Sequence, residues 1–117
     1  MESQPEQLRK RTKEFALRIV KLFRALPRSP VAQIMGRQAL RSGTSVAANY
    51  RAVCRARSKA EFVAKIGVVV EEADETVFWL EMLVESGIVR AAKMESLLKE
   101  ATELLAIFAA SQRTTRG

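Results

Sequence analysis

The amino-acid sequence predicts an all-α protein, an antiparallel up-down four-helix bundle that forms one domain over residues 1–117. Apolar residues recur every three to four positions along most of the chain, which is the period of an amphipathic helix. Helix start and stop signals interrupt that period at three places, and the short connections there fold consecutive helices side by side. A chain of this length that is 48% hydrophobic can bury a modest core.

The first helix is expected over residues 5–26, where Pro27 ends it. Its apolar face consists of Leu8, Phe15, Ile19, Leu22 and Leu26. A second face carries positive charge, from Lys10, Lys13, Lys21 and Arg24.

The second helix is expected over residues 30–56, with Ser29 as its N-cap and Pro30 in its first position. Gly43 and its hydroxyl-bearing neighbours weaken the middle of this helix, so a kink or a break there is a plausible alternative. The residues expected to face the core are Val31, Ile34, Met35, Val46, Ala47, Tyr50 and Val53.

The third helix is expected over residues 58–86, because Ser58 and Glu61 form a capping box and Gly87 suits the position after the helix. Its apolar seam follows a heptad period: Phe62, Ile66, Val69, Ala73, Thr76, Leu80 and Leu83. The fourth helix is expected over residues 90–112, before a frayed polar tail at 113–117. Its core positions are Met94, Leu97, Leu98, Ala101, Leu104, Leu105 and Phe108.

Four arginines of the second helix share one face: Arg37, Arg41, Arg51 and Arg55. On a continuous helix this stripe extends roughly 27 Å, at about 1.5 Å rise per residue. Such a line of guanidinium groups meets solvent, acidic protein or phosphate.

Charge is unevenly distributed along a chain whose net charge is +7. Residues 1–57 contain 13 Lys and Arg against 3 Asp and Glu, whereas residues 58–117 contain 7 against 10. This balance favours a polyanionic partner, although the two halves can also neutralise each other within or between subunits.

The third helix has a second apolar face, opposite its heptad seam, that predicts a subunit interface. The alternative is an ordinary surface with scattered apolar residues. Carboxylates of the same face would pair with the arginines of the second helix, within or between subunits. The candidate interface residues are Val68, Glu71, Glu72, Glu75, Phe78, Trp79 and Met82.

No catalytic signature is present, so we expect a protein that is not an enzyme and that uses no cofactor. The absence of histidine excludes Ser-His and Cys-His nucleophile pairs and Glu-x-x-His di-metal sites. We expect no metal site, with the alternative that the carboxylates at 71–75 bind Mg²⁺ or Ca²⁺ together with residues of another helix. Cys54 is expected to be a small core residue, with a reactive thiol as the alternative. A single cysteine, a polar N-terminus and the lack of a long apolar run predict a cytoplasmic protein without a membrane span.

Several segments resemble a bacterial family first described from open reading frames in intervening sequences of 23S rRNA genes. They are residues 37–51 (RQALRSGTSVAANYR), 58–62 (SKAEF), 71–75 (EEADE) and 79–81 (WLE). The resemblance implies a four-helix bundle assembled as a homopentamer. It also links the chain to accessory proteins of diversity-generating retroelements, which bind nucleic acid and a reverse transcriptase. Where many members follow the asparagine with Ile-Ala-Glu-Gly, Asn49 here precedes Tyr50-Arg51-Ala52-Val53, so no role of that carboxylate carries over.

Two functions remain open from the sequence. The first is a homo-oligomer that binds RNA or DNA through phosphates, with its basic residues on the first and second helices as candidate contacts. The second is a protein scaffold or accessory subunit, for example of a reverse transcriptase or a ribosomal component, in which the arginine stripe pairs with the carboxylates of the third helix.

Overall fold

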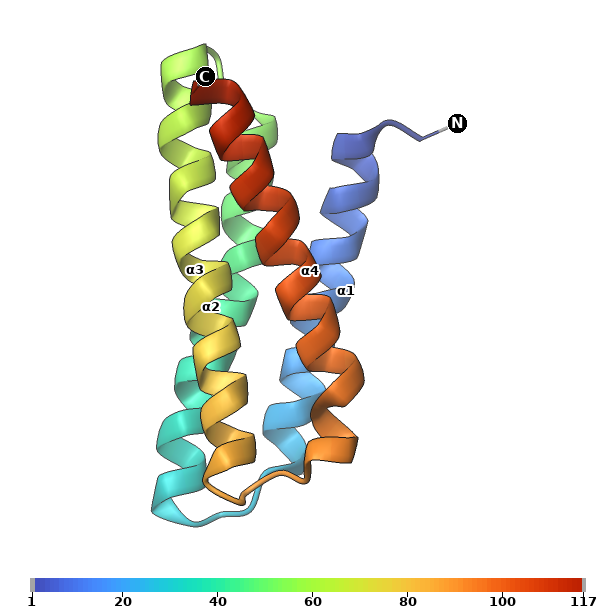
Figure 1. Ribbon diagram of the computed structural model, residues 1–117, viewed down its shortest axis with the longest axis vertical. Coiled ribbons are helices and arrows are strands. Elements are labelled where there is room, and N and C mark those ends of the chain that lie inside the picture. Colours follow the sequence, from blue (N-terminus) through green and yellow to red (C-terminus); the bar gives the residue numbers. More distant parts are fainter. Residues whose placement is uncertain (1, 117) are drawn as a thin grey trace.

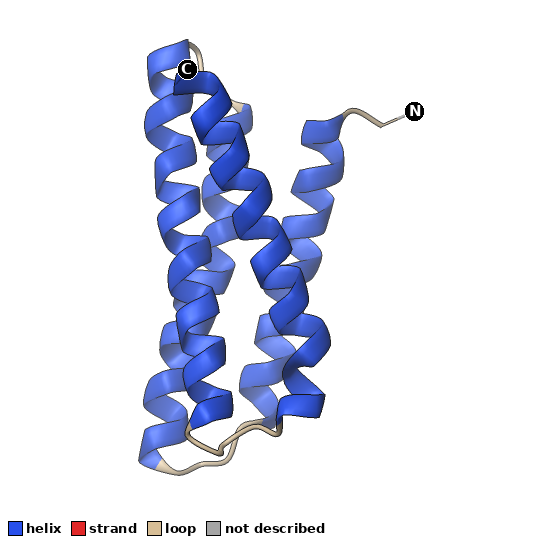
Figure 2. Cartoon of the chain, in the orientation of Figure 1, coloured by secondary structure: helices blue, strands red, loops and turns tan. Residues whose placement is uncertain are grey.

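The computed structural model describes residues 2–116 and places them in four helices joined by short loops (Figures 1 and 2). In chain order these are α1 (Gln4–Ala25), α2 (Pro30–Cys54), α3 (Lys59–Glu85) and α4 (Ala91–Arg116). Successive helices alternate in direction, so both ends of the chain lie at the same end of an elongated bundle (Figure 1). The predicted four-helix bundle is therefore confirmed, and no strand is present among these residues.

Serine side chains start three of the helices. The hydroxyls of Ser3, Ser29 and Ser58 each accept a hydrogen bond from the backbone N–H three residues later, which satisfies one of the free donors of the first turn. The predicted starts at Ser29-Pro30 and Ser58 are thus confirmed. The carboxylate of Glu61 accepts a hydrogen bond from the backbone N–H of Arg57, one residue earlier than a capping box requires.

Gly87 ends α3 as predicted. It has a φ of 81°, a left-handed conformation that favours glycine over any residue with a Cβ. The N–H of Ile88 donates to the carbonyl of Leu83, and the N–H of Gly87 donates to that of Val84. This pair of bonds is a Schellman motif, and it turns the chain sharply toward α4.

The core lies along the axis of the bundle and is built by residues at heptad spacing. Ile66, Val69, Leu80 and Leu83 of α3 are at most 1% exposed, which confirms the predicted seam of this helix. They join Phe15 and Ile19 of α1, Val46 of α2, and Leu104 and Phe108 of α4 in one cluster.

The first half of α2 faces the core with a different set of residues from the one predicted. Val31 and Ile34 are 54% and 59% exposed, so the assignment of these two to the core is wrong. The buried positions are Ala32, Gly36, Ala39, Ser42, Gly43, Val46, Tyr50 and Val53. Small residues occupy this seam because α1 approaches closely: a Cβ on Gly36 would lie 2.4 Å from Leu26, and one on Gly43 would lie 2.9 Å from Ile19.

The expected weakness in the middle of α2 does not break the helix, which is continuous from Pro30 to Cys54. The buried hydroxyl of Ser42 accepts a hydrogen bond of 2.9 Å from that of Thr76 on α3. Thr44 donates to the carbonyl of Leu40 within its own helix. The glycine and hydroxyl residues therefore allow close packing against α1 and α3.

The predicted fraying of residues 113–117 is wrong for the residues that the structure describes, because α4 continues to Arg116; Gly117 lies outside them. Arg113 and Arg116 lie in the last turn, where positive charge interacts favourably with the helix dipole. The hydroxyl of Thr115 also donates to the carbonyl of Ser111.

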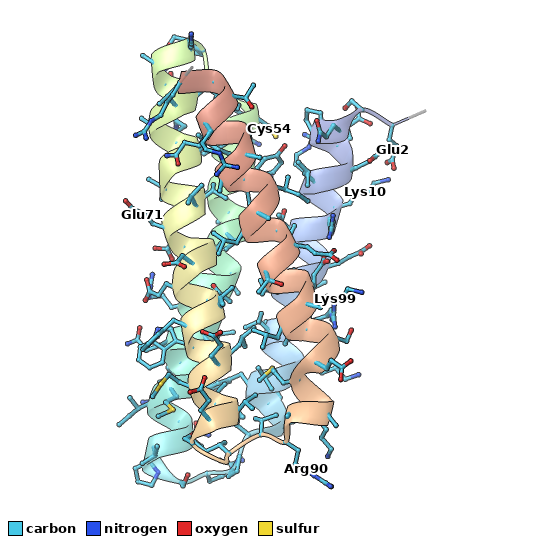
Figure 3. The ribbon with its side chains drawn as sticks, in the orientation of Figure 1. Glu2, Lys10, Cys54, Glu71, Arg90 and Lys99 are labelled. Atoms are coloured by element: carbon cyan, nitrogen blue, oxygen red, sulfur yellow. The ribbon has the colours of Figure 1, made fainter. Side chains whose placement is uncertain are left out.

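Cys54 is exposed, so the expectation of a buried core cysteine is wrong. It is the last residue of α2 and lies at the end of the bundle that holds both chain termini (Figure 3). Few contacts join α1 and α4, and the two helices diverge toward this end (Figure 1). Cys54 is therefore not covered by the apolar side chains that bury Val53, its neighbour in the sequence.

None of the helices that the structure describes combines the length and apolar character needed to cross a membrane.

Candidate nucleic-acid interface

Arg41 is held by two carboxylates of α3. Its guanidinium donates to Glu72 at 3.1 Å and to Glu75 at 2.5 Å. Glu75 also accepts a hydrogen bond from the indole N–H of Trp79 at 3.4 Å. The bond from Arg41 lowers the pKa of Glu75, and the same bond raises the pKa of Arg41. Of the two sequence-based alternatives for the arginine stripe, Arg41 thus follows the pairing with the third helix.

The other three arginines of the stripe are exposed. Arg37, Arg51 and Arg55 make no ion pair among residues 2–116. The stripe therefore divides into one neutralised position, Arg41, and three positions whose charge faces solvent.

Arg51 lies in a groove between α1 and α2 with a volume of about 440 Å³. Its α1 wall carries three basic side chains. Small side chains of α2 complete it, so a ligand backbone can approach α2 closely. The lining residues are Arg9, Lys10, Lys13, Thr44, Ala47, Ala48 and Arg51.

A second groove adjoins the first on the other side of α2, with a volume of about 620 Å³. Both grooves share Ala48 and Arg51, so they meet over the second half of α2. The second groove is lined by Ala48, Arg51, Ala52, Arg55, Arg57, Glu61 and Lys65. We call the basic residues of both grooves the basic track: Arg9, Lys10, Lys13, Arg51, Arg55, Arg57 and Lys65.

Two carboxylates lie close to the basic track. Glu61 lies 3.9 Å from Arg57 and 3.5 Å from Lys65, one helical turn away on either side. Glu2 pairs with Lys10, and their hydrogen bond raises the pKa of the lysine; both side chains extend from the N-terminal end of the chain (Figure 3). Exposed pairs of this kind contribute little to stability, so a phosphate group can replace the carboxylate at low cost.

The structure brings together four of the eight predicted phosphate contacts. Lys10 and Lys13 of α1 meet Arg51 and Arg55 of α2, because antiparallel helices place the first half of α1 beside the second half of α2. Four predicted contacts do not line these grooves: Lys21, Arg24, Arg37 and Arg41.

Three members of the basic track were missed from the sequence: Arg9, Arg57 and Lys65. Arg9 precedes the basic face of the first helix by one residue, and Arg57 lies in the connection after α2. No local sequence signal marks these three residues. They join the track through antiparallel packing, which brings the connection after α2 beside the start of α1.

The predicted interface residues lie on α3, outside its buried heptad seam. Phe78 and Val68 are 49% and 41% exposed, whereas Trp79 and Met82 are half-buried. The rings of Phe78 and Trp79 meet edge to face, with centroids 4.9 Å apart. Glu71 is exposed and points outward from α3 (Figure 3).

The neighbouring helix α2 also exposes apolar side chains. Met35 of α2 lies beside Ser86 of α3, so the first turns of α2 adjoin the last turns of α3. Val31 and Ile34, the two residues excluded from the core, belong to these first turns. We call six of the exposed and half-buried apolar residues of this helix pair the apolar patch: Val31, Ile34, Val68, Phe78, Trp79 and Met82.

Among residues 2–116, no group of three or more His, Cys, Asp or Glu side chains is placed to hold a metal ion. In the acidic segment at 71–75, Glu72 and Glu75 pair with Arg41, and Glu71 and Asp74 are exposed to solvent.

Comparison with known proteins identifies a family and a similar solved structure. The profile of the family described as 23S rRNA-intervening sequence protein matches residues 6–110. A crystal structure of a protein of unknown function from Bacteroides thetaiotaomicron, described as a member of the S23 ribosomal protein family, superimposes with a TM-score of 0.86. It is 32% identical and covers 95% of this chain and 99% of its own. No curated protein matches the chain.

Proposed function

Because the chain belongs to the family of 23S rRNA-intervening sequence proteins, and the similar crystal structure is of a protein of unknown function, we propose a role from the surface chemistry of this chain. The protein is a non-enzymatic accessory protein that binds RNA or DNA through phosphate groups. The basic track on α1, α2 and the start of α3 forms the contact surface.

The observation that carries this proposal is the lining of the two adjoining grooves. Seven basic side chains surround alanine and threonine, and one carboxylate, Glu61, is among them. Lysine and arginine side chains contact phosphate oxygens, and such contacts carry no information about the base sequence. Binding is therefore expected to be largely independent of sequence and to weaken steeply as salt rises.

We also propose that the apolar patch mediates homo-oligomerisation, most simply as the pentamer that the family resemblance implies. The patch and the basic track share no residue: the patch lies at the first turns of α2 and on α3, and the track lies over α1, the second half of α2 and the start of α3. The two surfaces adjoin only on α3, where Lys65 of the track precedes Val68 of the patch by one turn, so assembly would leave the groove between α1 and α2 accessible in every subunit. A pentamer would multiply the formal net charge of +7 fivefold and combine weak contacts by multivalency.

A second candidate function, a scaffold or accessory subunit for a protein such as a reverse transcriptase or a ribosomal component, is favoured by the apolar patch itself. The edge-to-face pair of Phe78 and Trp79 is the kind of aromatic surface that protein interfaces enrich. Arg41, Glu72 and Glu75 would provide a polar border for it.

The two functions are separated by measuring binding of a labelled nucleic acid at about 50 and 200 mM salt. The double variant Lys13→Ala/Arg51→Ala removes two charges from the basic track. It should weaken binding and lower the salt slope by about 0.9 for each duplex phosphate that the protein no longer neutralises. Lys93→Ala/Lys99→Ala removes two exposed charges from α4, away from the track, and serves as the matched control. If the wild-type protein binds no nucleic acid at about 50 mM salt, the scaffold function replaces the proposal.

A further inference from the structure

The two grooves of the basic track lie on opposite sides of one helix. Between them the outer side of α2 carries the small residues Ala48 and Ala52, each of which lines at least one of the grooves. The second half of α2 is therefore a low ridge with Arg51 and Arg55 along it, and a positively charged groove runs on either side.

The outer basic residues form two rows across this ridge. The α1 row consists of Arg9, Lys10 and Lys13, and the α3 row consists of Arg57 and Lys65. Since packed helices lie about 8–10 Å apart, the two grooves are separated by a comparable distance. All residues of the two rows except Arg57 are on helices, so their spacing is set by helix packing.

This spacing suits the backbone of a nucleic-acid duplex. The two phosphate strands of B-form DNA border grooves that are about 6 Å and 12 Å wide, a range that includes the separation of the two grooves of the basic track. A single strand has one backbone and can follow only one row at a time. Its unpaired bases would meet alanine methyls and charged side chains, whereas proteins that prefer single strands offer aromatic rings for stacking.

We propose that the basic track binds double-stranded nucleic acid, with one phosphate strand in each groove and the ridge of α2 between them. This inference rests on the proposed function and specifies its ligand. Ala48 and Ala52 allow the close approach, Arg51 and Arg55 lie nearest the middle of the duplex, and the two outer rows hold its two backbones.

The test compares a labelled DNA duplex, an RNA duplex and a single strand of equal length by fluorescence anisotropy over a salt series. The α1-row variant is Arg9→Ala/Lys13→Ala, and the α3-row variant is Arg57→Ala/Lys65→Ala. All four side chains lie on the surface, and circular dichroism with light scattering establishes that each variant keeps its fold and mass. Lys93→Ala/Lys99→Ala is again the control with an equal change in charge.

At least one duplex, of DNA or of RNA, should bind more tightly than the single strand. Each row variant should lower the salt slope for that duplex by about 1.8 per bound subunit, and combining both rows should add the effects. The control variant should leave the slope unchanged. Glu61→Gln, which removes the carboxylate from the α3 row, should tighten duplex binding.

Three results would overturn the inference. A single strand that binds as tightly as both duplexes with the same slope would show a one-backbone site, and the proposed function would stand. A duplex that responds to only one of the two rows would show the same. The absence of binding to all three ligands would remove the proposed function together with this inference.

Discussion

The contact between α2 and α3 and the contact between α1 and α4 hold the same bundle together by different means. The α2–α3 contact buries a heptad seam and a pair of hydroxyls, Ser42 and Thr76, away from water. The α1–α4 contact is sparse, and Arg11 crosses it with two hydrogen bonds of 2.7 Å to Glu100 and one of 2.8 Å to Glu103. Arg18 adds a hydrogen bond to Ser96.

The difference shows which conditions each contact resists. Buried apolar surface is stabilised by the hydrophobic effect and is nearly indifferent to simple salts at moderate concentration. Ion pairs at a partly exposed contact weaken as salt screens them. The stability of the contact between α2 and α3 should therefore be nearly independent of ionic strength, whereas that of the contact between α1 and α4 should depend on it.

The largest effect is expected from a substitution that removes buried side-chain atoms from the heptad seam of α3. Leu80 is fully buried, so Leu80→Ala should lower the free energy of unfolding by about 2–5 kcal/mol. The exposed control Lys99→Ala should change it by no more than about 0.5 kcal/mol. Urea denaturation followed by circular dichroism measures both, and equal midpoints would show that the heptad seam is not the main source of stability.

A smaller effect is expected at the α1–α4 contact. Arg11→Ala should cost about 1–2 kcal/mol, because it removes charge-assisted hydrogen bonds and leaves Glu100, whose side chain is 19% exposed, without its partner. The cost should shrink as sodium chloride is raised to about 1 M, where the screening length is about 3 Å. A cost that stays constant across this salt range would mean that Arg11 acts through packing.

The smallest effect concerns acid pH and the exposed pair on the α2–α3 contact. Arg41 holds the pKa of Glu75 below its usual value of 4.5, so the folded state binds the proton less readily than the unfolded state. The stability from this pair is present above the unfolded pKa and is lost as pH falls through the lower folded pKa. The difference between wild type and Glu75→Gln, less than about 1 kcal/mol at neutral pH, should therefore vanish on acidification below 4.5. A difference that grows on acidification would contradict the assignment.

Much of the fold could be predicted because its signals are local. Ser29, Ser58 and Gly87 act on backbone groups within a few residues, and the heptad of α3 repeats along one helix. Which residues of α2 face the core could not be predicted in the same way. Val31 and Ile34 are more apolar than Gly36 and Gly43. The glycines face inward because Ile19 and Phe23 of α1, and Leu26 just after it, pack against them.

The candidate site was predictable in residue type and less so in arrangement. The excess of lysine and arginine in the first half of the chain is visible in the sequence, and so are the carboxylates that Arg41 contacts. Which basic residues line the same groove depends on the register between helices. This register places Lys13 and Arg51 in one groove, and Arg24 and Arg37 outside it. Register is a tertiary property, set by packing over the whole helix.

The exposed thiol of Cys54 gives this chain a built-in attachment point for a probe. It is the only cysteine, and it ends the helix that carries Arg51 in the basic track. A maleimide reagent would place one label on each subunit without any engineered mutation, and counting photobleaching steps in a single particle would then count subunits. Because Cys54 lies close to Arg51 in the sequence, the same label would report nucleic-acid binding as a change in its fluorescence.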